Sequence, residues 1–241
     1  FVWHSKRADE PFLPLALMGG TVVPYGLMAS GCALGALIGL TVHLPLYYEL
    51  VYHLTPSQAG LGLIPIAAIS TFGAGIAGRT MARVKHYKRV AIIGTLIGTI
   101  AAAVMTVTTT SLWVLMGLLS IFGIGLGTAF PISVVSLQNA VDRSQIGTIT
   151  GAMNFFRSMM SSFTVAAFSA ILLMVLGADI SLAEGAHGAV SGIAEADMIH
   201  AFRFVYAAAT AMLACASICM MLMEERPLAG PSRNEPVEMA E

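Results

Sequence analysis

Three polar side chains stand inside or at the end of long apolar stretches of the 241-residue chain, where their presence needs a chemical reason. They are His43, Glu49 and Arg157. A polar group in hydrocarbon is costly unless it faces water, a partner or a cavity. His43 could therefore line a cavity and titrate near neutral pH, and Glu49 could attract a cationic compound. The alternatives are a helix-packing hydrogen bond for His43 and a solvated rim position for Glu49.

Arg157 is the single charge within its own apolar stretch. The 20 residues from Ser158 to Gly177 can span the membrane core without it, since they extend about 30 Å as a helix. Arg157 can therefore reach the inner interface with its long side chain. The alternative is a residue of an inner gate, which pairs with Asp142 or with another half of the protein.

Further candidates for a substrate path lie between these charged positions. Gln138 and Asn154 could hydrogen-bond to cargo at the inner mouth of a cavity, and Phe155 could add an adaptable apolar wall. Their alternative roles are helix capping for the amides and packing for Phe155. Together with His43 and Glu49, these three residues form the predicted substrate path.

The sequence contains no arrangement of residues that is typical of an enzyme. Gly-x-Ser-x-Gly, His-Glu-x-x-His and phosphate-loop motifs are lacking, and the six histidines are too dispersed to suggest a metal site. We therefore expect a protein that is not an enzyme and has neither cofactor nor metal. The net charge of -1 also gives no basic surface for a nucleic-acid partner.

The composition indicates the environment of the chain. Hydrophobic residues make up 57% and charged residues 10%, against about 25% charged residues in an average soluble domain. A soluble fold of this size could not cover its surface with so few charges. The sequence therefore predicts a polytopic all-α protein embedded in a lipid bilayer.

Six apolar stretches have the length of about 20 residues that crosses a bilayer as a helix. They cover residues 21–48, 58–78, 90–110, 112–138, 147–176 and 204–223. We expect a six-helix transmembrane domain over 21–223, a cytoplasmic lead-in at 1–20 and a cytoplasmic tail at 224–241. A polar stretch at 177–201 forms the one long connection.

Glycines recur at four-residue spacing within these stretches, a pattern typical of closely packed membrane helices. The pattern predicts packing seams in a compact bundle. It comprises Gly31, Gly35 and Gly39 in the first stretch, Gly94 and Gly98 in the third, Gly123 and Gly127 in the fourth, and Gly147 and Gly151 in the fifth.

The basic residues indicate an orientation. With six spans, ten Lys and Arg residues fall on one side, and the opposite loops hold Arg203 alone. Such an excess marks the cytoplasmic side, so we expect a multi-pass protein of the inner (plasma) membrane with both ends of this chain in the cytoplasm. Tyr47, Tyr48, Tyr52 and Trp113, at the opposite end, are typical of an aromatic belt at the interface.

The loop after the second stretch carries a specific pattern of glycine and basic residues. It reads GRTMARVKHYKR over residues 78–89, and it resembles the cytoplasmic loop signature of the major facilitator superfamily. Gly78, Arg83 and Lys88 match that signature, whereas Ala82 stands at the position of its Asp. The resemblance implies a closing role at the inner side for Gly78, Arg79, Arg83, Lys85, Lys88 and Arg89.

Other segments are similar to the fourteen-helix drug–proton antiporters of this superfamily. They are LPLYYELV at 44–51, LTPSQAG at 54–60, QNAV at 138–141 and NFFR at 154–157. By this resemblance the chain is the C-terminal six-helix half of such a transporter, built from two inverted three-helix repeats at about 21–110 and 112–223. Its partner is the N-terminal half, which is absent from this chain.

The resemblance implies proton-coupled export of amphipathic drugs or toxic compounds by alternating access, with a small molecule as substrate and the proton gradient as energy source. No Asp or Glu lies in the middle of a predicted span, so the proton-coupling carboxylates are expected in the other half. Two alternatives remain. One is a transporter of another cargo, such as a siderophore, sugar or metabolite, and the other is a membrane scaffold or sensor without transport.

Overall fold

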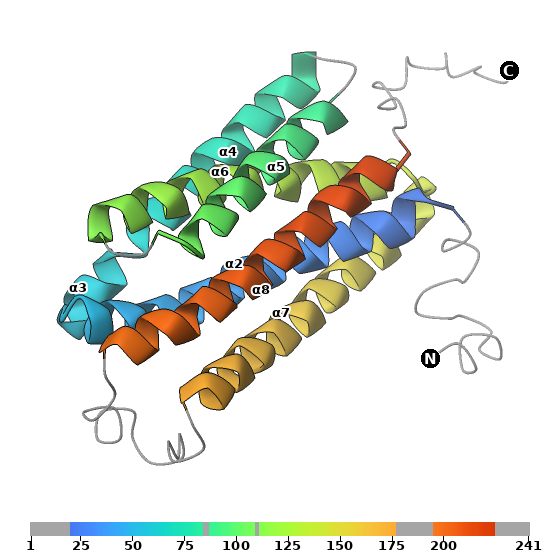
Figure 1. The fold of residues 1–241 in the computed structure, drawn as a ribbon. Coiled ribbons are helices and arrows are strands. Elements are labelled where there is room, and N and C mark those ends of the chain that lie inside the picture. The colour runs from blue at the N-terminus through green and yellow to red at the C-terminus, as the bar shows by residue number, and fades with distance from the viewer. Residues whose placement is uncertain (1–19, 84–86, 109–110, 177–194, 225–241) are drawn as a thin grey trace, which may run out of the picture.

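The computed structural model describes residues 20–83, 87–108, 111–176 and 195–224. Its helices are α2 (Val22–Val51), α3 (Pro56–Leu61), α4 (Ile64–Arg83), α5 (Lys88–Met105), α6 (Leu112–Gln138), α7 (Ile146–Leu176) and α8 (Glu195–Leu222), with a 3₁₀ turn, η2 (Arg143–Gln145), before α7 (Figure 1). Over these residues, six segments are long and apolar enough to cross a membrane, with α3 and α4 counted as one. The predicted all-α fold with six transmembrane helices is confirmed.

The helix bounds differ from the predicted spans notably at the start of α8 and at the end of α5. α8 begins at Glu195, nine residues before the predicted start at 204, because Asp197 and Arg203 lower the local hydropathy without interrupting the helix. α5 ends at Met105 rather than at 110, where the β-branched run Thr106–Val107–Thr108 follows. Such residues are weaker helix formers than the alanines before them.

The second span is divided into α3 and α4. Thr55 and Gln58 form a capping box at the start of α3, with Thr55 N donating to Gln58 Oε1 at 3.0 Å and Gln58 N donating to Thr55 Oγ1 at 3.4 Å. Gly62 ends α3, and Pro65, which lacks a backbone N–H, lies in the first turn of α4. The local sequence therefore explains both the start and the interruption of this span.

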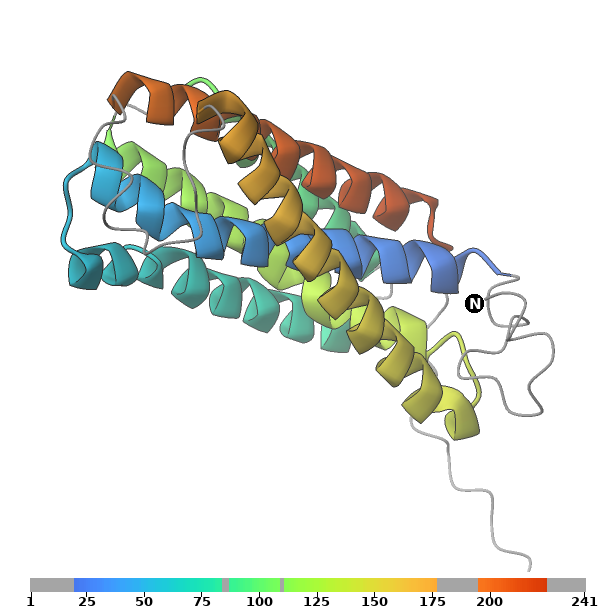
Figure 2. The same cartoon turned by 90° about the horizontal axis from the view of Figure 1, so that it is seen from below.

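The helices fall into two groups of three in chain order, and the main contacts join one group to the other. α2 packs mainly against α7 and α8 of the second group, and α6 packs mainly against α4 and α5 of the first group. α5 also packs against α8. Exchanging α2 with α6, α4 with α7 and α5 with α8 leaves these principal pairings unchanged. Figure 2 shows α8 on one side of the bundle and α4 on the other, with α2 and α6 between them.

Glycine allows three of these pairings to be close. A Cβ added at Gly35 would lie 2.6 Å from Thr164 Oγ1 of α7, and one added at Gly73 would lie 2.8 Å from the carbonyl oxygen of Ile124 in α6. A Cβ at Gly125 would lie 2.6 Å from the carbonyl oxygen of Gly94 in α5. The predicted packing seams are confirmed in α2, α5 and α6. At Gly147 and Gly151 of α7, by contrast, an added Cβ would meet nothing within 4 Å.

Tyr47 and Tyr48 were expected in an aromatic belt, and this prediction is wrong. Both side chains are fully buried. The Tyr47 ring packs 4.7 Å from Phe202 and 6.1 Å from Tyr206, measured between ring centroids. Phe202 in the early part of α8 covers Tyr47, whereas Tyr48 lies against Gly62 at the end of α3, and its hydroxyl donates to the Gly62 carbonyl at 3.3 Å. Trp113, by contrast, is exposed.

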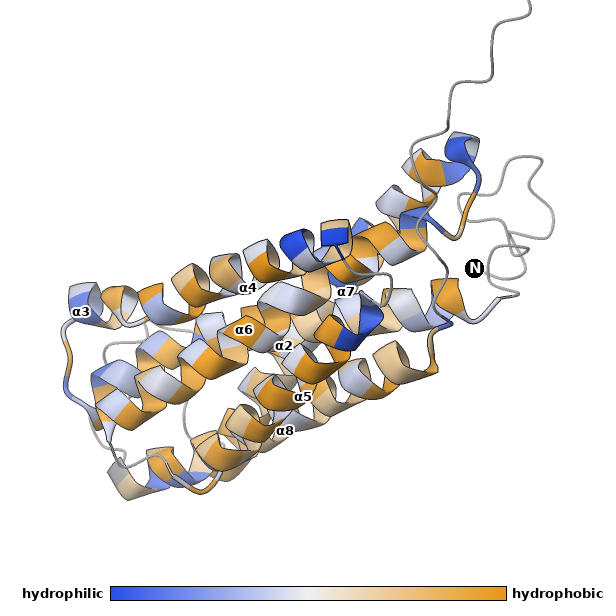
Figure 3. Cartoon of the chain, turned by 90° about the horizontal axis from the view of Figure 1, so that it is seen from above, coloured by the Kyte–Doolittle hydropathy of each residue, from blue (hydrophilic) through white to orange (hydrophobic). Residues whose placement is uncertain are grey.

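Basic residues lie at one end of the bundle. α4 ends and α5 and α7 begin there, with Arg79, Arg83, Arg89 and Arg143 exposed to the surroundings. Figure 3 shows the strongest hydrophilic colours at this end of the bundle. The remaining length of the helices is predominantly apolar, as a membrane-spanning region requires.

Candidate functional site

α7 is the least buried of the six spans, and α2 is the most buried. The exposed side of α7 forms one continuous surface with Ile38 of α2. We call this surface the α7 face, and it consists of Ile38, Phe155, Ser158, Met159, Ser161, Ser162, Phe163, Val165 and Ala166.

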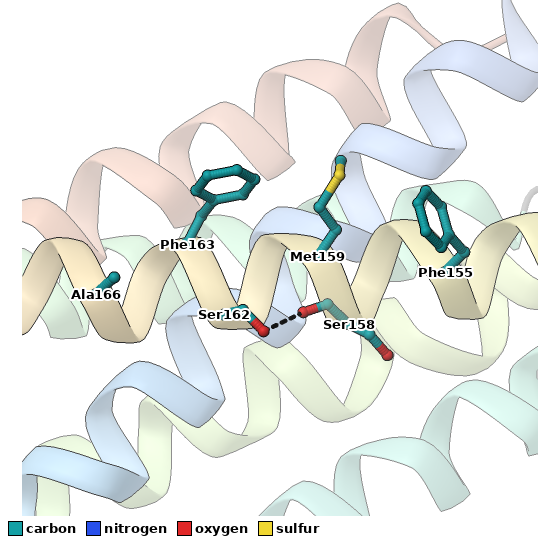
Figure 4. A pocket seen from close by; sticks show the side chains of 6 residues that line it. All are labelled: Phe155, Ser158, Met159, Ser162, Phe163 and Ala166. Carbon is teal, nitrogen blue, oxygen red and sulfur yellow. Dashed lines mark hydrogen bonds between the residues drawn. The ribbon is translucent and has the colours of Figure 1, made fainter. Parts of the chain in front are cut away.

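Two shallow grooves adjoin on the α7 face and share Ser162 and Ala166. The first is lined by α7 alone, and Figure 4 shows Phe155, Met159 and Phe163 along one edge of this face and Ser158 and Ser162 along the other. The Ser162 hydroxyl donates to the Ser158 carbonyl at 3.1 Å. The surface is therefore amphipathic, with an apolar aromatic edge beside a hydroxyl edge.

The second groove adds Ile38, which brings α2 to the same surface. Both grooves are open on the side away from the bundle. A compound lying in them would touch protein on one side only, whereas small-molecule sites normally bury most of their ligand. The α7 face can therefore form one wall of a binding site, and a second surface must complete it.

Arg157 lies beside the α7 face, where α7 meets α6. Its Nη2 donates to Ser133 Oγ at 3.3 Å, and its guanidinium carbon lies 5.6 Å from the centroid of the Phe130 ring. Its Nε is buried without a hydrogen-bond partner. Pairing with Asp142, the alternative considered above, is not among its contacts, and Asp142 itself is exposed in the turn before α7.

His43 lies between α2 and α7. Its side chain is 6% exposed, its Nδ1 lies 2.8 Å from the Gly39 carbonyl oxygen, and its Nε2 lies 3.0 Å from Ser169 Oγ. The carbonyl can only accept, so Nδ1 carries the proton and, in the neutral ring, Nε2 accepts from the Ser169 hydroxyl. The geometry is that of a hydrogen bond between packed helices, and its place on a substrate path stays a prediction.

Three other candidates for the substrate path, on α6 and α7, lie near the basic end of the bundle. Gln138 Nε2 donates to Thr150 Oγ1 at 3.2 Å and so links α6 to α7. Asn154 is exposed, and Phe155 is exposed with its ring 6.0 Å from that of Phe156. Asn154 and Phe155 are therefore accessible, whereas Gln138 already has a partner.

Glu49 is far from this group, because it lies in the last turn of α2 at the opposite end of the bundle. Its side chain is half-buried. The structure thus divides the predicted substrate path into a group near the basic end at Gln138, Asn154 and Phe155, a buried His43 in the α2–α7 seam, and Glu49 at the other end.

The residues of the signature loop differ in their surroundings. Gly78, Arg79, Arg83 and Arg89 are exposed, and Lys85 lies outside the described residues. Lys88 has a different role, because its Nζ donates to the carbonyl oxygens of Met221 and Met223 at the end of α8. A lysine at this position satisfies carbonyls that a helix end leaves free and complements the helix dipole.

Sequence reasoning missed the residues that hold these side chains. Ser133 and Phe130 position Arg157, and Ser169 completes the contact of His43. Ser162 and Phe163 belong to the α7 face. A helical count along α7 places 155, 158, 162 and 166 on one side, and this spacing could have indicated the surface. Among the described residues, no group of three or more His, Cys, Asp or Glu could hold a metal ion.

Comparison with known proteins identifies the family. The sequence model of the Major Facilitator Superfamily matches residues 2–165. A tetracycline resistance determinant of Streptomyces rimosus is 28% identical over 71% of this chain and 50% of its own length. The efflux pump FUS6 of Gibberella moniliformis is 29% identical over 67% of the chain and 29% of its own length.

A third relative is the multidrug transporter protein MdtP of Bacillus subtilis, which is 24% identical over 71% of the chain and 32% of its own length. The chain thus spans half or less of the length of these curated relatives. The family match covers more than half of the chain, and the six membrane-length helices agree with it. The chain belongs to the major facilitator superfamily.

Proposed function

We propose that the chain is the C-terminal six-helix half of a fourteen-helix transporter that exports amphipathic drugs or toxic compounds in exchange for protons. The names of the three relatives describe tetracycline resistance, efflux and multidrug transport. Each relative is at least twice as long as the part that matches. An N-terminal half would then work with these helices by alternating access.

The observation that carries this proposal is the one-sided groove on the α7 face. Its edge of Phe155, Met159 and Phe163 suits the apolar body of a compound, and Ser158 and Ser162 suit its polar groups. Flexible Met and aromatic side chains adapt to compounds of different shape. The other half would supply the second wall, and rocking of the two halves would open the groove to each side in turn.

The energy source we propose is the proton gradient, with proton binding in the other half. In the described helices, acidic residues lie at helix ends, such as Glu49 in α2 and Asp197 in α8. A proton relay within a membrane ordinarily uses carboxylates inside the spans. We further propose that the protein lies in the inner membrane with its basic end on the cytoplasmic side. There, Arg79, Arg83 and Arg89 would contact the other half when the transporter closes on that side.

The test is transport by the full-length protein in inside-out membrane vesicles. A proton gradient should drive uptake of a fluorescent cationic dye, and an uncoupler should abolish it. Ser162→Trp should block the groove and reduce transport about tenfold or more, because an indole cannot share that space with a ligand. Met174→Trp, at an exposed position later in α7, is the matched control and should retain transport.

Absence of gradient-driven uptake by a well-expressed protein, across a panel of cationic, neutral and anionic compounds, would overturn the proposed transport. Equal transport by Ser162→Trp and the wild-type protein would remove the α7 face from the path. Glu49→Gln and His43→Ala belong in the same experiment. A selective loss of transport in either variant places that residue on the path.

A further inference from the structure

Arg157 is a cation without a counter-ion in the described part of the chain. Its single side-chain hydrogen bond goes to Ser133, its Nε has no acceptor, and no described carboxylate pairs with it. A guanidinium presents five N–H donors in a planar fork. An arginine in a membrane span is stable when an anion or water meets these donors, so most of its binding capacity is open to a partner.

The position of the guanidinium is fixed by α6. Ser133 is fully buried, and its hydroxyl donates to the carbonyl oxygens of Ala129 at 2.8 Å and Phe130 at 3.0 Å. The lone pairs of Ser133 therefore face Arg157 Nη2, and the Phe130 ring lies beside the guanidinium. A side chain that only reached for the membrane surface would not need two contacts on a neighbouring helix.

The immediate neighbours of Arg157 on α7 add both polar and apolar groups. Asn154 and Ser158 lie within one turn and are exposed, so that their side chains can donate to an oxygen atom. On the same side of α7 as Arg157, Ser161 and Val165 follow at four-residue spacing, and they line the second groove of the α7 face with Ile38. An anionic head beside an apolar body is the chemistry that this neighbourhood complements.

We propose that Arg157 binds an anionic oxygen of the transported compound, a carboxylate or an enolate, while the apolar body lies on the α7 face. This inference rests on the proposed export function and specifies its substrate class as anionic or zwitterionic amphiphiles. Fork-shaped recognition of a carboxylate by arginine is strong and directional. Ser133 is the positioning residue, since it holds Nη2 in place.

The experiment compares two dyes that differ in one carboxylate. Rhodamine B has a free carboxylate, and its ethyl ester has the same cationic ring system without it. Binding of each dye to the purified full-length protein is measured by fluorescence anisotropy, and gradient-driven uptake is measured in inside-out vesicles. The variants are Arg157→Gln and Ser133→Ala, with Arg203→Gln as the control, because Arg203 is an exposed cation on α8.

We expect Arg157→Gln to weaken binding of rhodamine B about tenfold or more and to leave binding of the ester within about twofold. Ser133→Ala should weaken rhodamine B binding about threefold, and Arg203→Gln should change neither dye. Equal effects of Arg157→Gln on both dyes would overturn the inference and assign Arg157 to a carboxylate of the other half. So would equal binding of the two dyes to the wild-type protein.

The two measurements separate this inference from the proposed function. If rhodamine B binding depends on Arg157 but neither dye is taken up in response to the gradient, the proposed carboxylate site stands and the proposed export is wrong. Uptake of the ester with no dependence on Arg157 for either dye would retain export and overturn the carboxylate site.

Discussion

Gly73 and Gly75 are two residues apart in α4 and have opposite surroundings. A Cβ at Gly73 would lie 2.8 Å from the Ile124 carbonyl oxygen of α6, whereas a Cβ at Gly75 would meet nothing within 4 Å. The same contrast separates Gly31, Gly35 and Gly39 of α2, which pack on α7, from Gly147 and Gly151 of α7, which do not pack. The bundle thus has closed seams inside it and open small-residue surfaces on α4 and α7.

This difference shows that glycine spacing has two meanings in the same chain. In lipid, small residues serve chiefly to let helices approach. The closed seams hold the six helices together, whereas the open surfaces have no such use within the described bundle. They are therefore the places where the second half of the proposed transporter can approach.

The largest expected effect comes from filling a closed seam of α6. In Gly127→Ala the new Cβ would overlap the backbone carbonyl oxygen of Ser70 in α4, and neither backbone can move without separating the helices. We expect a loss of roughly 3 kcal/mol in the free energy of unfolding, measured by denaturation of the purified full-length protein in detergent. Gly117→Ala, in the same helix with open space around it, is the control and should leave stability unchanged or slightly raised.

The next largest effect concerns the polar contact in the α2–α7 seam. His43→Ala removes the link to Ser169 and leaves a gap beside Phe168, whose ring centroid lies 5.9 Å from that of His43. We expect a loss of roughly 2 kcal/mol, and about 0.6 kcal/mol for Ser169→Ala, in the same denaturation measurement. If His43→Ala left stability unchanged and selectively reduced transport, the role of His43 would be substrate transport rather than helix packing.

A smaller effect is expected at the end of α8. Lys88→Ala removes the donor to the Met221 and Met223 carbonyl oxygens, and contacts of this kind stabilise a helix end by about 0.5 kcal/mol. Hydrogen exchange should become faster in the last turn of α8 and stay unchanged in the middle of that helix. Arg89→Ala changes the neighbouring exposed cation and should leave exchange in α8 as it is.

The smallest effect is expected on the open surfaces. Gly75→Ala and Gly151→Ala place a methyl group in open space, and alanine is a better helix former than glycine by up to about 1 kcal/mol. Thermal denaturation should show unchanged or slightly raised stability. A loss as large as that of Gly127→Ala would show that another part of the full-length protein packs closely on these glycines.

Hydropathy was enough to predict the spans, because each of the six helices carries a long apolar run. It could not locate the start of α8, where Asp197 and Arg203 lie in a helix that continues beyond the apolar run. Hydropathy also could not show which tyrosines at the end of α2 are buried inside the bundle. Tyr47 is buried because Phe202 covers it, and that contact joins residues that are far apart in the sequence.

The candidate site was predictable in its residue types and less so in their partners. Arg157 stood out as a charge in an apolar stretch, and its neighbours Asn154 and Phe155 were identified with it. Ser133 was not, because serine is common in membrane helices and only the crossing of α6 and α7 brings it to the guanidinium. Sequence spacing describes one helix at a time, whereas a site between helices depends on how they cross.

The exchange of partners between the two groups of helices has a consequence for biosynthesis. The glycine side of α2 packs on Met160, Thr164 and Phe168 of α7, which the ribosome makes about 130 residues later. At a synthesis rate of about 5–20 residues per second, roughly 6 to 26 s pass between the synthesis of α2 and that of its partner α7. During this time the glycine side of α2 lacks the α7 residues that cover it in the finished bundle, so a nascent chain that stalls before α7 leaves a surface for quality control to recognise.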